Sequence, residues 1–476
     1  MKIRYGLALT MAIGLGLAGC ASGGGAGGSG GAPVAGGGGV TMAAGETPRN
    51  TENTRAAEEA LDAAVEATDP AQALTLFQQA LASAEAAIAE DSLNPLAHRL
   101  AGNAAVGVEE YEAAGEHWDR AIELRPLYEI DLGGLREQTW IDLYQQATPH
   151  VQAGEYEAAA EYFEGANAVY RGRPEAMVTL GQIYATMREH DRALENIEAA
   201  LAFRDSEAMA EVDEETAAAW EEAIAELPYL RAQVLADAGR FEEAVDTYRE
   251  MSAADPDNIE IKQGLAAILM EMGEEQDAFV IYEEMIAMPG LSSADLFAIG
   301  VGYYQGSDYA GAVQAFSQAA ETSVNDRDAI EMWARSLQLD SLYAEVPPVA
   351  ERWIELDPNS QNAYLILAQS QNQLGDQAAT QQAVRSVEAL EAAVNDLTLR
   401  RFAGGGGSVT GSVINKTLSQ GARVTLTFTF YDDAGTSIGT VTESVTVGAA
   451  DMAQVFQIEF DSAQQVGGYG YTLTTG

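Results

Sequence analysis

The sequence predicts a mainly α protein, in which a solenoid of stacked helical hairpins is followed by a small all-β sandwich domain. A 34-residue period runs through residues 225–394, and from residue 424 apolar residues alternate with threonine. A glycine run at 404–407 separates the two patterns. We therefore expect a signal segment at 1–19, a Gly-rich flexible tether at 20–50, the solenoid at 51–396, a hinge at 397–407 and the sandwich at 408–476.

The first twenty residues combine a short basic stretch, an apolar run and a cysteine. Lys2 and Arg4 precede an apolar run that ends at Leu17. This run is shorter than the about 20 residues that a helix needs to span a bilayer. Ala-Gly then leads to Cys20, the only cysteine of the chain. This order of features resembles a bacterial lipoprotein signal peptide. The resemblance implies cleavage before Cys20 and acylation of that residue, for example with palmitate. The alternative is an ordinary signal peptide that ends in a cysteine by chance.

The resemblance also implies a location. Alanine rather than aspartate follows Cys20. In Gram-negative lipoproteins this favours the outer membrane, on its periplasmic or surface face. Residues 21–47 are mostly Gly, Ala and Ser with almost nothing to bury, which is typical of a flexible tether between an anchor and a folded part.

Helical periodicity begins near Thr54, where two Ala-rich helices running to about Glu90 form a candidate N-terminal hairpin. Three clearer units follow, opening at Pro95, near Trp140 and at Pro174. Eleven extra residues separate the first two, and seventeen precede Ala225. We expect these insertions to lengthen helices or the loops between repeats.

Five units then follow in unbroken register. Alanine or glycine stands at the eighth place of each, and an aromatic residue at the twenty-fourth place of three (Tyr248, Tyr282 and Phe316). This pattern resembles the tetratricopeptide repeat (TPR) family, W-x2-L-G-x2-Y, then A-x3-F, then P. The last two units depart from it, with Ala350 and Val384 where an aromatic is expected. The count is about eight repeats in addition to the N-terminal hairpin.

Past the glycine run, the sequence predicts short antiparallel strands and an immunoglobulin-like sandwich. Residues 432–435 (Asp-Asp-Ala-Gly) predict a turn between two strands. The run Phe428-Thr429-Phe430-Tyr431-Asp432, after Gly411-x-Val413-x-Asn415, resembles the bacterial FxLYD domain, with Phe430 in place of leucine. Asn415-Lys416-Thr417 is formally a glycosylation sequon, for which we favour a turn.

The chain is strongly acidic, with a formal net charge of −48 from 73 acidic and 25 basic residues. Such a surface repels phosphate backbones, so nucleic-acid binding is disfavoured. Two interpretations stay open. The acidity serves a basic partner or divalent cations, or it keeps the surface solvated in a salty environment. The spread of acids along the whole chain favours the second.

No residue pattern points to catalysis, a cofactor or a metal site. The four histidines lack ligand spacing and fall mostly at packing places of their units, and paired acids such as Glu242 and Asp246 arise by chance at this density. Serines near the glycine runs lack the context that a G-x-S-x-G motif needs, and the glycine run at 21–47 has neither a strand before it nor the Gly-Lys-Ser/Thr ending of a phosphate loop. We therefore expect a protein that is not an enzyme.

What remains is a binding surface. In the TPR family the first helix of each hairpin lines a concave groove, mainly through places two, five, nine and twelve. The resemblance places these candidate partner-binding residues there: Tyr229, Gln233, Gln263, Met270, Phe297, Val301, Tyr304, Arg335, Gln338, Gln369 and Asn372.

The expected function is therefore a lipid-anchored envelope scaffold that binds proteins or peptides. Two alternatives from other classes stay open: a surface spacer or adhesion lipoprotein, and a hydrolase of envelope polymers.

Overall fold

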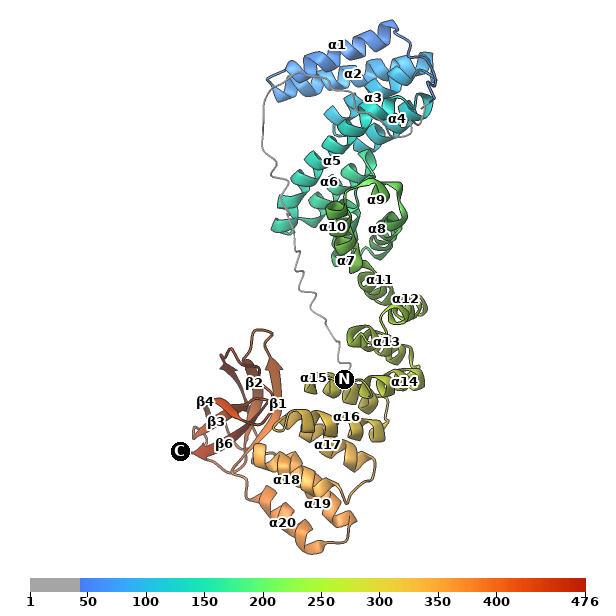
Figure 1. Cartoon of the computed structure of the whole chain (residues 1–476). Coiled ribbons are helices and arrows are strands. Elements are labelled where there is room, and N and C mark those ends of the chain that lie inside the picture. Colours follow the sequence, from blue (N-terminus) through green and yellow to red (C-terminus); the bar gives the residue numbers. More distant parts are fainter. Residues whose placement is uncertain (1–42) are drawn as a thin grey trace. The chain divides into compact units, whose positions relative to one another are not determined.

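The computed structural model describes residues 43–476, so the signal segment, Cys20 and most of the predicted tether lie outside the described residues. Helices come first and strands last (Figure 1). The helices are α1 (Glu52–Glu66), α2 (Pro70–Glu90), α3 (Pro95–Gly107), α4 (Tyr111–Leu124), α5 (Tyr128–Ala153), α6 (Tyr156–Val169), α7 (Glu175–Met187), α8 (His190–Ala202), η1 (Phe203–Asp205), α9 (Glu207–Glu211), α10 (Glu214–Ala225), α11 (Leu227–Asp237), α12 (Phe241–Ala254), α13 (Ile259–Met272), α14 (Glu275–Ile286), α15 (Ser293–Gln305), α16 (Tyr309–Thr322), α17 (Arg327–Leu339), α18 (Val346–Leu356), α19 (Gln361–Gln373) and α20 (Gln377–Glu388). The strands are β1 (Ala392–Arg401), β2 (Gly407–Asn415), β3 (Arg423–Tyr431), β4 (Ser437–Thr446), β5 (Ala453–Phe460) and β6 (Gly468–Thr475). This order confirms the predicted fold class.

The described chain forms two compact units, one made of residues up to 108 with 117–133 and the other of 109–116 with 134–476. In the first unit, Asp69 and Asn94 cap α2 and α3, each followed by a proline in the first turn. Alanine lets these helices approach closely, since Ala57, Ala84 and Ala101 are fully buried. The predicted N-terminal hairpin is thus α1 and α2.

The end of the predicted tether is not free. Glu46 N–H donates to Leu124 O (2.7 Å), and Arg125 Nη1 donates to Ala44 O (3.0 Å). Arg49 N–H donates to Asn94 Oδ1 (3.0 Å), whose amide returns a bond to Arg49 O (2.8 Å). Residues 44–49 therefore bind the first unit, which corrects the predicted tether boundary at residue 50.

The second unit continues the hairpins. Gly154, Gly239, Gly273 and Gly375 end first helices at positive φ between +73° and +80°, where other residues are strained. The first insertion lengthens α5 to 26 residues, and the second forms η1, α9 and α10. The aromatic missing at Ala350 is supplied one turn later by Trp353, which is fully buried.

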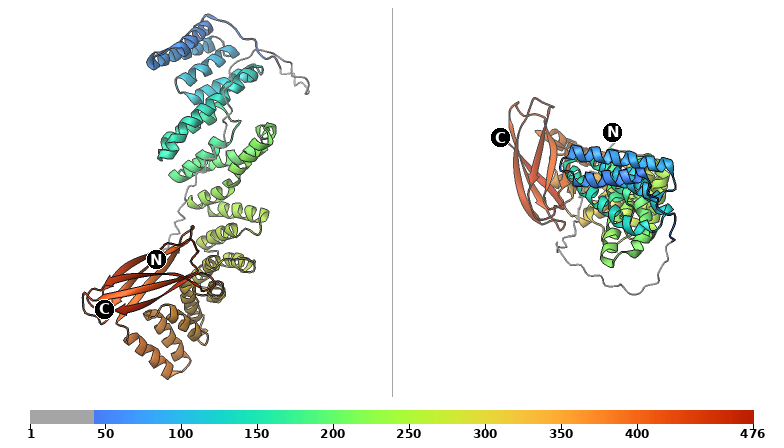
Figure 2. Two further views of the ribbon diagram at one scale, coloured as in Figure 1. Left: turned by 60° about the vertical axis from the view of Figure 1, so that its left-hand side comes forward. Right: turned by 90° about the horizontal axis from the view of Figure 1, so that it is seen from above.

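Two three-stranded antiparallel sheets form the sandwich, in the orders β1-β2-β5 and β4-β3-β6. Figure 2 shows these strands in red and orange at the C-terminal end of the chain. These orders match strands A-B-E and C′-C-F of the immunoglobulin fold. The predicted alternation is confirmed by four fully buried side chains of β3, those of Val424, Leu426, Phe428 and Phe430. Residues 432–435 form the predicted turn, with Gly435 at φ +79°.

The residues of the FxLYD-like motif have packing roles here. Phe428 and Phe430 fill the core, and Asp432 Oδ1 accepts from Thr436 N–H (2.7 Å) in the turn. Asn415 is fully buried and its side chain amide donates to Leu418 O and Gly448 O, both at 2.9 Å. Asn415 thus ties two loops together, in keeping with the predicted turn at the sequon.

The predicted hinge at 397–407 is wrong. Residues 392–401 form β1, which pairs with β2, and only a tight loop follows before Gly407. A β-bulge between Asn395 and Thr398, with Asp396 at φ +55°, interrupts the alternation that would have revealed this strand. The sandwich therefore begins at Ala392, and only three residues separate it from α20.

Buried charges join the sandwich to the last hairpins. Arg327 donates to Asp357 Oδ2 through Nη2 (2.7 Å) and Nε (3.1 Å), and Tyr471 Oη donates to Asp357 Oδ1 (2.6 Å). Beside them, Tyr469 Oη donates to Asp328 Oδ1 (2.9 Å). Because undocking the sandwich would take the Tyr471 hydrogen bond away from the buried Asp357 carboxylate, this junction resists separation.

Candidate functional site

All the groove residues taken from the TPR resemblance lie on first helices of successive hairpins. Tyr229 and Gln233 are on α11, and Gln263 and Met270 on α13. The remaining residues lie on α15 (Phe297, Val301 and Tyr304), α17 (Arg335 and Gln338) and α19 (Gln369 and Asn372). The fold thus places them on equivalent elements, as the repeat register predicts.

The apolar members are half-buried rather than exposed. Tyr229, Met270, Phe297, Val301 and Tyr304 all pack against the core of α11–α16 and keep part of their surface in solvent. Ring contacts fix the aromatics, since Phe297 meets Phe316 edge-on at 5.3 Å and Tyr304 meets Tyr309 at 5.7 Å between centroids. These side chains are therefore held in place before any partner arrives.

Some of the polar side chains are already bonded within the chain, and others are exposed to solvent. Gln263 Nε2 donates to Asp295 Oδ1 (3.2 Å). Arg335 pairs with Glu331 (2.6 Å) and lies over the Trp353 ring, so its charge is already matched within the chain. Gln369 and Asn372 on α19 are exposed.

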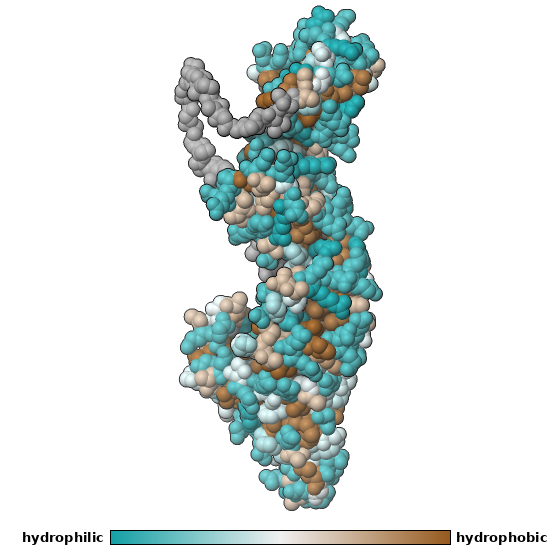
Figure 3. All heavy atoms as spheres, turned by 45° about the vertical axis from the view of Figure 1, so that its right-hand side comes forward, coloured by the Kyte–Doolittle hydropathy of each residue, from teal (hydrophilic) through white to brown (hydrophobic). Residues whose placement is uncertain are grey.

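Leu365 on α19 belongs to the same surface and was missed in the sequence. It is 43% exposed and stands at the fifth place of its unit, as Phe297 does in its own. The register alone could have identified it. Figure 3 shows hydrophobic residues exposed among hydrophilic ones on the face that it draws.

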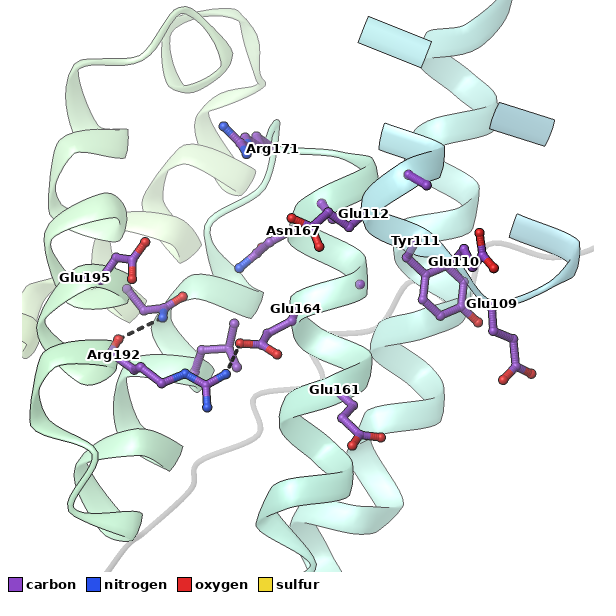
Figure 4. Close-up of a pocket in the computed structure, with 15 residues that line it drawn as sticks. Glu109, Glu110, Tyr111, Glu112, Glu161, Glu164, Asn167, Arg171, Arg192 and Glu195 are labelled. Atoms are coloured by element: carbon purple, nitrogen blue, oxygen red, sulfur yellow. Dashed lines mark hydrogen bonds and ion pairs between the residues drawn. The ribbon is translucent and has the colours of Figure 1, made fainter. Parts of the chain in front are cut away.

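A separate acidic pocket of about 730 Å³ lies between the second helices of three hairpins, α4, α6 and α8. Figure 4 shows Glu109, Glu110 and Glu112 at the start of α4, Glu161 and Glu164 on α6, and Glu195 and Arg192 on α8. Glycines allow α4 and α6 to approach, since a Cβ on Gly165 would lie 2.7 Å from the Tyr111 ring.

Inside this pocket the charges are partly matched. Glu164 accepts from Tyr184 Oη (2.7 Å) and pairs with Arg192. Burial, reinforced by the bond to Glu164, raises the pKa of Tyr184 above its ordinary value. The buried Oδ1 of Asn167 has no hydrogen-bond partner among the described residues. Sequence reasoning missed this pocket because only the fold brings its carboxylates together.

Histidines form one contact that the sequence did not suggest. The Nδ1 atoms of His98 and His117 lie 3.4 Å apart, and burial lowers the pKa of His98. His150 Nδ1 lies 2.6 Å from Glu155 Oε2.

Over residues 43–476, no group of three or more His, Cys, Asp or Glu is placed to hold a metal ion. In the same range, no helix is both long enough and apolar enough to cross a bilayer.

The hairpins, their register and the row of side chains on the first helices define a helical-repeat protein. Residues 174–206 and 235–287 each match a family model described as tetratricopeptide repeat. These segments lie in α7–α8 and α11–α14, so the hairpins of these two segments are similar to tetratricopeptide repeats.

Solved structures overlap parts of this chain. The C-terminal part of a TPR repeat-containing protein from Cytophaga hutchinsonii is 18% identical, covering 52% of this chain and 95% of that one, with a TM-score of 0.38. YrrB, described as a TPR protein with an unusual peptide-binding site, is 14% identical over 37% of this chain and 91% of its own, with a TM-score of 0.30. MamA from Desulfovibrio magneticus RS-1 is 16% identical over 35% and 94%, with a TM-score of 0.29. No curated protein matches the chain.

Proposed function

We propose that this protein is a non-enzymatic TPR scaffold that binds an extended peptide or a helix of another protein over the first-helix faces of α11–α19. The observation that carries the proposal is the row Tyr229, Met270, Phe297, Val301 and Tyr304. Each of these side chains is held by the core yet keeps apolar surface in solvent. Preorganised aromatic anchors of this kind supply most of the affinity in protein interfaces.

The test is a pull-down after mild crosslinking in intact cells, comparing the native chain with the Phe297→Ala/Tyr304→Ala variant. We expect the native chain to recover a defined partner and the variant to lose it by at least tenfold, because removing two anchors costs about 2 kcal/mol or more.

Val280→Ala is the matched control. Val280 is 53% exposed on α14, a second helix, so its truncation removes apolar surface outside the row. The control should retain the partner. Recovery of no defined partner by the native chain, or equal recovery by the double variant, would contradict the proposal.

We further propose that the mature chain is a lipoprotein attached through acylated Cys20 to an envelope membrane, the outer membrane if the organism is Gram-negative. Support comes from the sequence of residues 1–20. Two acyl chains would hold the protein stably, at about 0.8 kcal/mol for each buried methylene.

Fractionation tests the anchor. The native protein should sediment with membranes and give a lipidated N-terminal fragment in mass spectrometry, whereas Cys20→Ala should appear in the soluble fraction. An unmodified Cys20 in native membranes would refute attachment at this residue.

A further inference from the structure

The sandwich has four outer strands, because β1, β5, β4 and β6 each end a sheet. An outer strand presents a row of unpaired backbone N–H and C=O groups, which can pair with another extended chain. Proteins usually block such edges with bulges, inward-facing charges or covering segments. Within the part of the chain that the structure describes, three of the four edges are blocked, and that of β5 has no such protection.

The helical array covers the edge of β1. Val394 N–H donates to Asn359 O (3.0 Å), and the Asn359 amide donates to Ala392 O (3.0 Å). After the bulge, Leu399 N–H donates to Asp328 Oδ2 (3.2 Å). No further strand can reach this edge while the sandwich stays docked.

The other sheet is protected by different means. At the start of β6, Tyr469 N–H donates to Asn325 O (3.1 Å), and Gly470 packs against Leu356. In β4 the pairing with β3 is irregular near Phe430, and Glu443, which is exposed, lies by register on the same side of the strand as Val441 and Val445. A charge on that side of an outer strand opposes edge pairing.

Over residues 43–476, the edge of β5 has no bulge, no inward-facing charge and no segment hydrogen-bonded to it, and β4 of the other sheet packs nearby without pairing with it. β5 pairs with β2 without a register shift from Ala453 to Phe460 and contains no proline, lysine or arginine. Asn415 N–H donates to Met452 O (3.3 Å). In an antiparallel pair, opposite residues alternate between hydrogen-bonded and non-hydrogen-bonded pairs, so this bond shows which residues of β5 direct their backbone groups to β2. The backbone groups of Val455, Gln457 and Glu459 therefore point away from β2, and the Val455 side chain is 81% exposed.

We propose that the free edge of β5 binds an extended segment of a basic partner protein as an added antiparallel strand. The exposed side chains define its chemistry. An apolar residue of the partner would lie opposite Val455, and a lysine or arginine opposite Glu459, four residues away on the same face. Gln457, whose amide bonds to Glu459 Oε1 (3.1 Å), lies between them.

Charge decides between a foreign strand and a second copy of this chain. The net charge of −48 repels a second copy at long range, and Asp451, Glu459 and Asp461 lie along or beside β5 itself. Those same charges attract a cationic segment and steer its approach. The site is separate from the first-helix faces of α11–α19, so it stands or falls independently of the proposed groove.

The test measures binding of a fluorescein-labelled peptide, Thr-Lys-Thr-Thr-Thr-Val-Thr, to the full chain by anisotropy at low salt. Gln457→Pro removes one outward N–H that β2 does not use, and proline is tolerated on such an edge. We expect this variant to bind about tenfold more weakly, the effect of losing one or two backbone hydrogen bonds. Gln457→Thr keeps the N–H and should bind like the native chain.

A charge swap guards against loss of binding through misfolding. Glu459→Lys should reject the lysine peptide and bind the same peptide with glutamate in place of lysine. Three results would overturn the proposal: no binding of the lysine peptide by the native chain, equal binding by Gln457→Pro, or a concentration-dependent dimer that Gln457→Pro abolishes.

Discussion

Asp326 shows how one side chain can serve both parts of the second unit. Its Oδ1 caps α17 by accepting from Ala329 N–H (3.1 Å), while Oδ2 accepts from Arg401 of the sandwich (2.9 Å) and from Ser293 (3.1 Å). The cap could be predicted from the Asp-Arg-Asp start of a repeat. The bond to Arg401, 75 residues away, could not, because it depends on where the sandwich docks.

Titration of Asp326 gives a pH prediction. Burial raises the pKa of this carboxyl above its ordinary value of 3.8, although Arg401 opposes the rise. Between the ordinary and the raised pKa, the folded state keeps a proton that the unfolded chain has released. This contribution therefore stabilises the fold at low pH and is lost as pH rises through that interval.

Asp326→Asn isolates the effect because asparagine keeps the cap but does not titrate. The unfolding free energy of the native chain minus that of the variant should fall as pH rises from 3.8 and then level off. A tenfold change in an acid dissociation constant on folding corresponds to about 1.4 kcal/mol of unfolding free energy. Urea denaturation followed by circular dichroism at a series of pH values measures the difference. A difference that rises with pH would contradict the assignment.

At the scale of elements, the 34-residue period predicted the hairpins because each repeat must bury the same face against its neighbours. It did not predict β1. Asn395 and Asp396 form a bulge inside that strand, so the sequence there shows neither alternation nor helical spacing. The period also did not locate the buried aromatic residue of the fourth unit. An aromatic is expected at 350, but the structure has Trp353 in this role, one turn later on α18.

The hairpin crossing can be tested at its small residue. A Cβ on Gly300 of α15 would lie 2.6 Å from the Phe316 ring of α16, so Gly300→Ala should destabilise the array by about 1–3 kcal/mol. Gly134 of α5 has nothing within 4 Å of such an atom, and Gly134→Ala should stabilise by about 0.5–1 kcal/mol. Thermal unfolding of both variants checks the pair. Equal effects would mean that helix propensity, rather than close packing, decides.

Over the whole molecule, charge is the property that no single element explains. The candidate groove residues could be predicted because they follow the repeat register. The acidic pocket at α4, α6 and α8 could not, since Glu112, Glu164 and Glu195 are adjacent only after three hairpins stack. There are two interpretations of the acidity: surface solvation in salt, and a site for cations or a basic partner. They predict different effects of added salts on stability.

Salt dependence separates these interpretations. Raising NaCl from about 0.01 M to about 0.15 M shortens the Debye length from about 30 Å to about 8 Å, which screens the repulsion among 73 acidic residues against only 25 basic ones. The thermal midpoint should therefore rise, by about 2–4 °C for each kcal/mol of repulsion removed. If screening alone acts, MgCl2 at the same ionic strength should give the same midpoint as NaCl. A larger rise with MgCl2 would instead indicate bound divalent cations, and an unchanged midpoint in both salts would show that the acids repel one another too little to matter for folding.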